Sequence, residues 1–376
     1  MDAIVLYPSP GMGHLISMVE LGKLIVNLHP SISIIILATT PSFNTGSTAA
    51  YIRHVSATTP SITFHHLPTI KLDPSTYTSI EAVTFDLLHL NNPFVCEALQ
   101  SISTSSTIAA IIMDLFCTPA LSVAADLKIP AYYFFTSGAG LLALFLYIPT
   151  IDKTTTKSFN EVSTLLHVPS LPPIPSFDMI MPMLDRTSSE YASFVHFASQ
   201  LPKAAGVIVN TFENLEHKQV KAINEGECLP DVPTPPVFCV GPLIAADGQG
   251  GSGGRHECLS WLDSQPGESV VFLCFGSLGV FSAKQLKEIA VGLERSEQRV
   301  LLVRELKLAL PMTVADDGFV SAAEVEKRVR ELMESEGGRL VRDRVTVASE
   351  EAKLAMKEGG SSHRALVKLV ESLKLR

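Results

Sequence analysis

The sequence predicts an α/β protein with doubly wound parallel sheets, arranged as two domains. Over the first two-thirds of the chain, short β-branched and apolar runs alternate with amphipathic stretches, which is typical of a parallel sheet covered by helices. A Gly-rich segment at 248–254 then precedes a second strand-and-helix pattern. The 376 residues suffice for two cores. We therefore place an N-terminal domain at 1–244, a linker at 245–256 and a C-terminal domain at 257–376.

The N-terminal domain is expected to alternate strands and helices. Apolar β-branched runs predict the strands, and amphipathic periodicity predicts the helices. The predicted strands are 3–7, 32–37, 62–65, 109–113, 131–135 and 206–209. The predicted helices are 14–28, 79–102, 119–127, 138–147 and 214–224. Because strands and helices follow one another in turn, we expect an open, doubly wound sheet.

Fewer helices and strands are predicted for the C-terminal domain than for the N-terminal one. Residues 258–262 suggest a short helix, and residues 269–275 form a nearly continuous apolar strand. Ser282 and Ser321 each begin a capping pattern, so helices are expected to run from them to Leu293 and to about Glu334. Residues 297–312 contain no Gly, which leaves little that could form a phosphate-binding loop.

Composition excludes several classes of protein. Hydrophobic residues make up 46% and charged residues 18%, so the chain is not intrinsically disordered. The net charge is −9 and no basic stripe is present, so no nucleic-acid partner is expected. The N-terminus lacks the pattern of a secretory leader. Residues 129–149 are uncharged, but Pro130 and residues 136–138 interrupt them, which predicts a strand and a core helix instead of a membrane span.

The six cysteines are scattered and have no metal-ligand spacing. Buried free thiols in a reduced, cytoplasmic protein are the simplest interpretation. The sequence therefore predicts neither a disulfide framework nor a metal site.

A turn of small residues follows the first predicted strand. Residues 8–14, Pro-Ser-Pro-Gly-Met-Gly-His, lead directly into an amphipathic helix. Ligands of open α/β sheets bind at the carboxyl ends of strands, where Gly11 and Gly13 permit close backbone approach. His14 is a candidate general base, because an imidazole with a pKa of about 6.5 accepts a proton near neutral pH. The alternative is that His14 only caps the helix or packs against it.

Asp114 follows five apolar residues and so ends a buried strand. An orienting carboxylate fixes the tautomer of a catalytic imidazole and stabilises the imidazolium. Because the carboxyl ends of parallel strands meet at one edge of the sheet, we expect Asp114 to lie beside His14. The alternative is a cap for the helix that begins near Thr118.

In the second domain, Ser277 ends an apolar strand ahead of a helix. Its hydroxyl and the neighbouring backbone N–H groups are candidate phosphate ligands. The alternative is an ordinary strand-to-helix turn, where Gly and Ser are common.

Seven motifs in the same order resemble the plant family-1 UDP-glycosyltransferases, in particular the group that acts on flavonoids, chalcones and related phenols. The motifs lie at 8–14, 113–116, 134–139, 209–213, 240–243, 261–263 and 274–279. The resemblance runs from the first residue to about Gln298 and resumes from about Val300. It implies a GT-B fold, in which two Rossmann-like domains face a cleft. The acceptor then lies mainly against the N-terminal domain and the UDP-sugar against the C-terminal one.

The resemblance also implies roles for individual residues. His14 removes the proton of an acceptor hydroxyl, Asp114 orients His14, and the oxygen attacks the anomeric carbon with inversion. Thr136 matches a position that contacts the donor sugar, and Ser277 one that contacts the diphosphate. The UDP-sugar is a co-substrate, and no cofactor or metal is implied.

On the acceptor side, Gly13 lets the acceptor approach the base. Phe85, Phe116 and Phe134 are candidate walls for an aromatic acceptor, with plain core packing as the alternative. The expected partners are a phenolic acceptor and a UDP-sugar, and the expected state is a monomer.

The sequence departs from the family pattern between Gln298 and Val300. Members normally carry there a Trp-Ala-Pro-Gln run, a His-Cys-Gly-Trp-Asn-Ser run and a closing acidic-Gln pair, and none is present. Residues 299–305 therefore look like a junction, and the C-terminal domain is expected to be truncated internally. The missing residues would position the donor, and orientation of this kind contributes roughly 7–11 kcal/mol to catalysis.

Two hypotheses follow. The first is a UDP-glycosyltransferase that transfers a sugar, with glucose expected, to a phenolic hydroxyl and is impaired in this chain. The alternative is a non-catalytic deletion product that at most binds a small phenolic ligand. A nicotinamide-dependent oxidoreductase would need a full glycine fingerprint, but Ile16 occupies the position of its third glycine.

Overall fold

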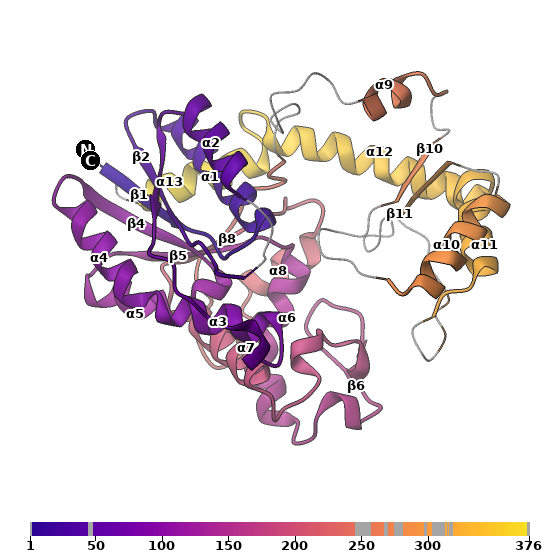
Figure 1. The fold of residues 1–376 in the computed structure, drawn as a ribbon, viewed down its shortest axis with the longest axis horizontal. Coiled ribbons are helices and arrows are strands. Elements are labelled where there is room, and N and C mark those ends of the chain that lie inside the picture. Colours follow the sequence, from indigo (N-terminus) through magenta and orange to yellow (C-terminus); the bar gives the residue numbers. More distant parts are fainter. Residues whose placement is uncertain are drawn as a thin grey trace. The chain divides into compact units, whose positions relative to one another are not determined.

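The computed structural model describes residues 2–43, 48–244, 257–266, 270–273, 281–296, 299–302, 313, 315 and 319–373. The chain forms two compact units (Figure 1), of which the first comprises Met1–Gly251 and Leu354–Arg376 and the second Ser252–Lys353. The predicted linker at 245–256 lies outside the described residues. The predicted C-terminal domain at 257–376 differs from the second unit at its end, because Leu354–Arg376 belong to the first unit.

Within the described residues, the first unit contains a sheet of seven parallel strands in the order β3-β2-β1-β4-β5-β8-β9. The strands are β1 (Asp2–Tyr7), β2 (Ser33–Ala38), β3 (Ile62–His66), β4 (Thr107–Asp114), β5 (Ala131–Phe135), β8 (Gly206–Val209) and β9 (Val237–Cys239). The first six lie within two residues of their predicted bounds, whereas β9 was not predicted. The strand order reverses between β1 and β4, which confirms the doubly wound sheet and creates a switch point where ligands bind in such folds.

Helices cover both faces of this sheet because its strands bury both sets of side chains. Along β1, Val5 and Tyr7 belong to one buried cluster, and Ile4 and Leu6 to the other. One face is covered by α1 (Met12–Leu28), α2 (Ala49–Thr58) and α13 (Ser361–Ser372). The other is covered by α3 (Ile80–Leu90), α4 (Asn92–Ser103), α5 (Ala120–Asp126), α6 (Ala139–Thr154), α7 (Ser189–Gln200) and α8 (His217–Asn224). The helix α13 lies beside α1 (Figure 1), and Ser362 Oγ donates a hydrogen bond to Gly241 O at 2.6 Å.

Three predicted helices have different bounds. The single helix expected at 79–102 is wrong, because the structure has α3 and α4 meeting at Asn91. Pro93 lies in the first turn of α4, where a missing N–H costs nothing, but it would break a continuous helix. The expected end of α6 before Pro149 is also wrong, since α6 continues through Pro149 to Thr154 while Ile148 and Ile151 pack in the core. The helix α8 begins three residues later than predicted.

The second unit contains a β-α-β segment followed by two helices. Strands β10 (Val270–Leu273) and β11 (Arg299–Leu302) pair in parallel. The helices are α9 (Glu257–Asp263), α10 (Ala283–Ser296), α11 (Ala322–Glu334) and α12 (Glu336–Met356), the last of which reaches the unit boundary. Both predicted caps are confirmed, because Ser282 Oγ accepts from Gln285 N at 3.1 Å and Ser321 Oγ from Glu324 N at 3.3 Å.

A short antiparallel pair, β6 (Leu165–Leu166) and β7 (Ile174–Pro175), lies between α6 and α7 in the chain. Among the helices that the structure describes, none is both long and apolar enough to cross a membrane.

Candidate active site

His14 lies in the first turn of α1, directly after the turn that leaves β1. Gly11 has a φ of 123°, a backbone conformation that L side chains rarely adopt, so glycine is required there. Gly13 is exposed, and a Cβ added to it would meet nothing within 4 Å. The turn therefore presents the His14 imidazole at the switch point, with 30% of its side chain exposed.

Asp114 is the last residue of β4, the strand next to β1 in the sheet. His14 Nδ1 and Asp114 Oδ2 are 2.7 Å apart, as the adjacent strand ends predicted. The Asp114 side chain is only 1% exposed, and its Oδ1 accepts a hydrogen bond from Phe116 N at 3.1 Å. Asp114 therefore both contacts His14 and caps the short turn Leu115–Cys117 after β4, whereas the helix that the sequence offered as its partner, α5, begins at Ala120 without a side-chain cap.

The electrostatics of this pair favour an imidazole that readily accepts a proton. Burial by itself lowers the pKa of His14, but the negative charge and the hydrogen bond of Asp114 outweigh it, so the pKa lies above its ordinary value of 6.5. When His14 is neutral, Nδ1–H donates to the carboxylate, which leaves the lone pair on Nε2. The arrangement can thus withdraw a proton from a hydroxyl at Nε2 and stabilise the resulting imidazolium.

A cluster of phenylalanine rings extends from this pair. The Phe116 ring lies edge-on to the His14 ring with centroids 5.8 Å apart, and the Phe85 ring is 5.5 Å from that of Phe116. Phe194 and Phe197 of α7 also contact both Phe85 and Phe116. The sequence interpretation missed Phe194 and Phe197. The only local signal for them was their spacing at i and i+3 on one face of an amphipathic helix.

Phe134 lies elsewhere. It is fully buried in the cluster on the α1 face of the sheet, whereas Phe85 belongs to the cluster on the other face. Because its side chain is 0% exposed, Phe134 has no free surface to offer an acceptor. Its role is therefore core packing, the alternative that the sequence left open.

Thr136 follows β5 at the same edge of the sheet and is partly buried. The helix α6 begins shortly afterwards, but its first N–H groups are already occupied: Glu216 accepts from Ala139 N and Gly140 N, each at 2.8 Å. Thr211 Oγ1 also donates to this carboxylate at 2.5 Å. Glu216 was not predicted, since it lies 77 residues from Ala139 and nothing local indicates the contact.

Ser277 lies outside the described residues, so it is not placed relative to the other site residues. No group of three or more metal-ligating side chains occurs among the residues that were described. Cys96, Cys117, Cys228 and Cys239 are free thiols. Burial raises the pKa of Cys117 well above its ordinary value, so this thiol next to the site is an unreactive one.

Comparison with known proteins decides the family. The chain is 40% identical to UDP-glycosyltransferase 88B1 of Stevia rebaudiana, with 98% of each chain covered. The chain belongs to the plant UDP-glycosyltransferase family. It is also 39% identical to a phloretin 2′-O-glucosyltransferase of Malus domestica over 99% of both chains. No model of a protein family matches the sequence.

Solved plant UDP-glycosyltransferases share the fold. A UDP-glucosyltransferase from Polygonum tinctorium that glucosylates indoxyl, solved with 3,4-dichloroaniline, superimposes with a TM-score of 0.89 at 27% identity, covering 100% of this chain and 99% of the other. UGT2 of Phytolacca americana, in complex with UDP-2-fluoro-glucose and pterostilbene, gives 0.87 at 27% identity with both chains fully covered. The GT-B fold expected from the sequence is confirmed.

This family member is shorter than its relatives. The alignment with UDP-glycosyltransferase 88F4 of Malus domestica spans 478 positions, whereas this chain has 376 residues, so at least 102 aligned positions (478 − 376) have no counterpart here. That these positions lie together between Gln298 and Val300 stays a prediction.

Proposed function

We propose that this chain carries the acceptor-activating half of an inverting UDP-glucosyltransferase, with a phenolic hydroxyl as the acceptor. The 2.7 Å contact between the partly exposed His14 and the buried Asp114 carries the proposal. Phe116 and Phe85 supply an aromatic wall beside the base, and Gly13 leaves room for the acceptor to approach it. Two relatives, a phloretin 2′-O-glucosyltransferase of Malus domestica and an anthocyanidin 5,3-O-glucosyltransferase of a Rosa hybrid cultivar, support a phenolic acceptor.

The reaction follows from this geometry. A phenol with a pKa near 10 is largely protonated at neutral pH, so it attacks slowly unless a base removes its proton. His14 Nε2 takes that proton as the phenolic oxygen forms a bond to the anomeric carbon. The bond between that carbon and UDP breaks on the opposite side, and UDP leaves with the electron pair, which inverts the configuration. Asp114 stabilises the imidazolium until the proton is released to solvent.

The donor is proposed to be UDP-glucose, used without a cofactor or metal ion. Thr136 is proposed to contact the sugar, because it follows β5 at the edge that also holds His14. Ser277 is proposed to contact the diphosphate on the basis of its motif alone. We further propose a cytoplasmic location, which the free thiols support, and a monomeric state.

We propose that turnover by this chain is impaired. At least 102 positions present in a relative are absent, and the described part of the second unit has a sheet of only two strands. Binding energy that positions the donor is a major part of catalysis, so its loss slows transfer more than the loss of any single side chain. The same observation favours a second candidate function, a non-catalytic protein that binds phenols at the His14 edge of its first unit.

Glucoside formation from UDP-glucose and phloretin tests both candidates. We expect slow transfer by the intact chain and loss of that transfer in His14→Ala. The control His167→Ala, which replaces an exposed histidine outside the proposed site, should leave the rate unchanged. Transfer that is unchanged in His14→Ala contradicts the mechanism. A rate as fast as that of the full-length relatives contradicts impairment. Calorimetry that detects phloretin but not UDP-glucose favours the second candidate.

A further inference from the structure

Two buried tyrosines flank the strand end that carries Asp114. Tyr7 is the last residue of β1, and Tyr133 lies in β5. Each is paired with Met113 of β4, the strand between them, and all three belong to the buried cluster on the face of the sheet that α3 to α8 cover. Because neighbouring strands lie about 4.8 Å apart, the backbones of the two tyrosines are roughly 10 Å apart. Their side chains therefore lie on one face, on either side of the residue before Asp114.

The hydroxyl groups of these tyrosines are buried without hydrogen-bond partners. Tyr7 and Tyr133 are both 0% exposed, and neither hydroxyl has a partner among the residues that the structure describes. Thr39, which directly follows β2, adds a third buried hydroxyl of this kind. A buried hydroxyl that has lost its hydrogen bonds to solvent and gained none is costly, and such atoms are rare in folded proteins. Three of them at one edge of the sheet indicate a small polar molecule between them.

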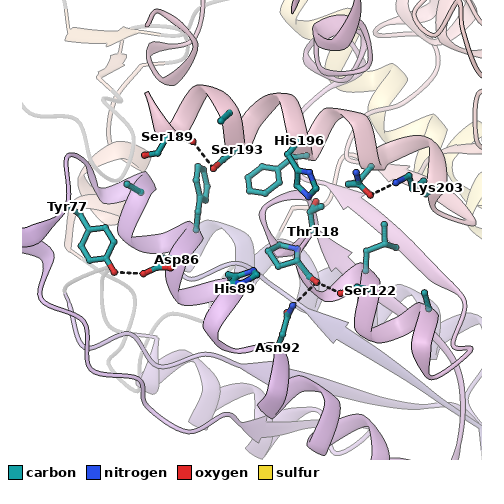
Figure 2. Close-up of a pocket in the computed structure, with 18 residues that line it drawn as sticks. Tyr77, Asp86, His89, Asn92, Thr118, Ser122, Ser189, Ser193, His196 and Lys203 are labelled. Carbon is teal, nitrogen blue, oxygen red and sulfur yellow. Dashed lines mark hydrogen bonds between the residues drawn. The ribbon is translucent and has the colours of Figure 1, made fainter. Parts of the chain in front are cut away.

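A groove of about 980 Å³ between α3, α5 and α7 (Figure 2) ends short of these hydroxyls. Thr118 is one of its lining residues, whereas Tyr7, Thr39 and Tyr133 are not. The Thr118 hydroxyl donates to Leu115 O at 2.6 Å, so it is not free to donate to Tyr133. The molecule that pairs with the tyrosine hydroxyls is therefore enclosed, and a substrate in the groove does not take its place.

The surroundings of Cys117 place both tyrosine hydroxyls near the short turn after β4. Burial raises the pKa of Tyr7 well above its ordinary value, the Cys117 thiol raises it further, and the Thr39 hydroxyl lowers it. Burial raises the pKa of Tyr133 as well, and Cys117 contributes to that rise. Cys117 is the last residue of the short turn that directly follows Asp114. The unpaired hydroxyls therefore adjoin the segment that fixes Asp114.

Water fits this site better than a larger or charged ligand. A hydroxyl both donates and accepts, so an uncharged molecule that does the same can pair with all three. A buried water makes about three hydrogen bonds to groups that are otherwise unpaired. A larger ligand would need an opening, but both tyrosines are 0% exposed. The buried charge of Asp114 disfavours an anion.

We propose that buried water occupies the space among the hydroxyls of Tyr7, Thr39 and Tyr133. Its hydrogen bonds tie together the ends of β1 and β2 and the side chain from β5, beside the short turn after β4. The three hydroxyls are thereby satisfied, and the turn is held in one position.

The water acts on the proposed base through this turn. Asp114 Oδ1 accepts from Phe116 N at 3.1 Å within the turn, and Asp114 Oδ2 lies 2.7 Å from His14 Nδ1. Burial lowers the pKa of His14 and Asp114 raises it, so a turn that shifts and loosens this contact lets the pKa fall. Tyr7 and Tyr133 are thus positioning residues. Their role rests on the proposed base, but it is measurable without sugar transfer.

Titration of His14 by nitrogen-15 NMR in the full chain tests this role. Tyr7→Phe and Tyr133→Phe each remove one hydroxyl and keep the ring. We expect the pKa of His14 to fall by about half a unit in each variant, which is a roughly threefold weaker affinity for the proton, and further in the double variant. The control Tyr132→Phe removes a hydroxyl of β5 that lies on the other face of the sheet, 3.1 Å from Ser372 Oγ. It should leave the pKa of His14 unchanged, even where it lowers the melting temperature.

Stability and crystallography detect the water itself. If the Tyr7 hydroxyl had no partner, Tyr7→Phe would remove an unpaired polar group and stabilise the chain. We expect instead that the folding equilibrium constant, measured by urea titration, falls roughly fivefold, because hydrogen bonds to the water are lost. A crystal structure of the parent chain should show ordered water within hydrogen-bond distance of both tyrosine hydroxyls.

Four results overturn the proposal. They are an unchanged pKa of His14 in the double variant, an equal shift of that pKa in Tyr132→Phe, a Tyr7→Phe variant more stable than the parent, and a crystal structure without such water. A parent chain that forms no glucoside rejects the proposed transferase and leaves these measurements in force.

Discussion

Replacing Asp114 by Asn tests the proposed base at a single atom. The carboxylate now serves two donors, with Oδ2 on His14 Nδ1 at 2.7 Å and Oδ1 on Phe116 N at 3.1 Å. In Asp114→Asn the amide has one oxygen, and the backbone N–H of Phe116 requires it. The amide NH₂ then faces His14, so Nδ1 must accept and the proton moves to Nε2. The variant keeps its shape but holds the imidazole in the wrong tautomer.

The expected loss of transfer rate in Asp114→Asn follows from the strength of the hydrogen bond between His14 and the carboxylate. A hydrogen bond to a charged group contributes about 1.5–3 kcal/mol, which corresponds to a ~10- to 150-fold slower transfer. We expect the upper end of this range, because Asp114 is buried and the neutral variant also fails to stabilise the imidazolium. The pKa of His14 should fall, since the charge of Asp114 is what raises it.

Nitrogen-15 NMR of the imidazole reads the tautomer directly, even where turnover is slow. In the parent chain above the pKa of His14 we expect the proton on Nδ1, and in Asp114→Asn on Nε2. The transfer rate of the parent should decline as pH drops through the raised pKa, because the base becomes protonated. In the variant this decline should move to lower pH.

The control is Asp126→Asn, which removes an exposed carboxylate from α5. It should change neither the tautomer nor the rate. If Asp114→Asn retains a proton on Nδ1 and transfers sugar as fast as the parent, then Asp114 does not orient the base.

Three further predictions concern stability. Glu216→Gln weakens the cap of α6 and should lower the free energy of unfolding by about 1.5–3 kcal/mol in urea titrations, as for other lost hydrogen bonds to charged groups. Gly241→Ala should cost a similar amount, roughly 1–3 kcal/mol, and lower the melting temperature, because its Cβ would lie 2.6 Å from Asn210 Oδ1. The pKa of Glu190 is lowered from 4.5 to about 2, chiefly by the hydrogen bond from Ser79. Stability from this carboxylate is therefore present above pH 4.5 and lost as pH falls toward 2, and Glu190→Gln should remove that part of the acid dependence.

The parallel sheet was predictable because buried parallel strands are recognisable from local composition. Strands with both faces covered are continuously apolar, and the six predicted strands stand out for that reason. The strand β9 was not predicted, because its three residues, which precede a Pro-containing turn, are too few to show a periodic pattern. Pro93 was a local signal for the break between α3 and α4. In contrast, α6 continues through Pro149, because tertiary packing offsets the backbone hydrogen bond that this proline removes.

The contact between His14 and Asp114, the proposed catalytic pair, was predictable for a different reason. His14 and Asp114 are 100 residues apart, but each follows a strand of one parallel sheet, and topology brings such strand ends together. No comparable rule predicts the contact between Glu216 and α6, since a side chain from a loop can cap any helix that lies near it. The return of α13 to the first unit is equally invisible, because an amphipathic helix does not specify which apolar surface it covers.

The sequence by itself determined the alternation of strands and helices, the family, and the two residues that form the proposed base, since these depend on local patterns and on strand order. Only the tertiary structure decided that Phe134 is core while Phe116 adjoins His14, and that Glu216 accepts hydrogen bonds from the first turn of α6. The physical reason is that these features depend on side chains from distant segments meeting in space. Such contacts are fixed by packing, and packing has no signature within a short stretch of chain.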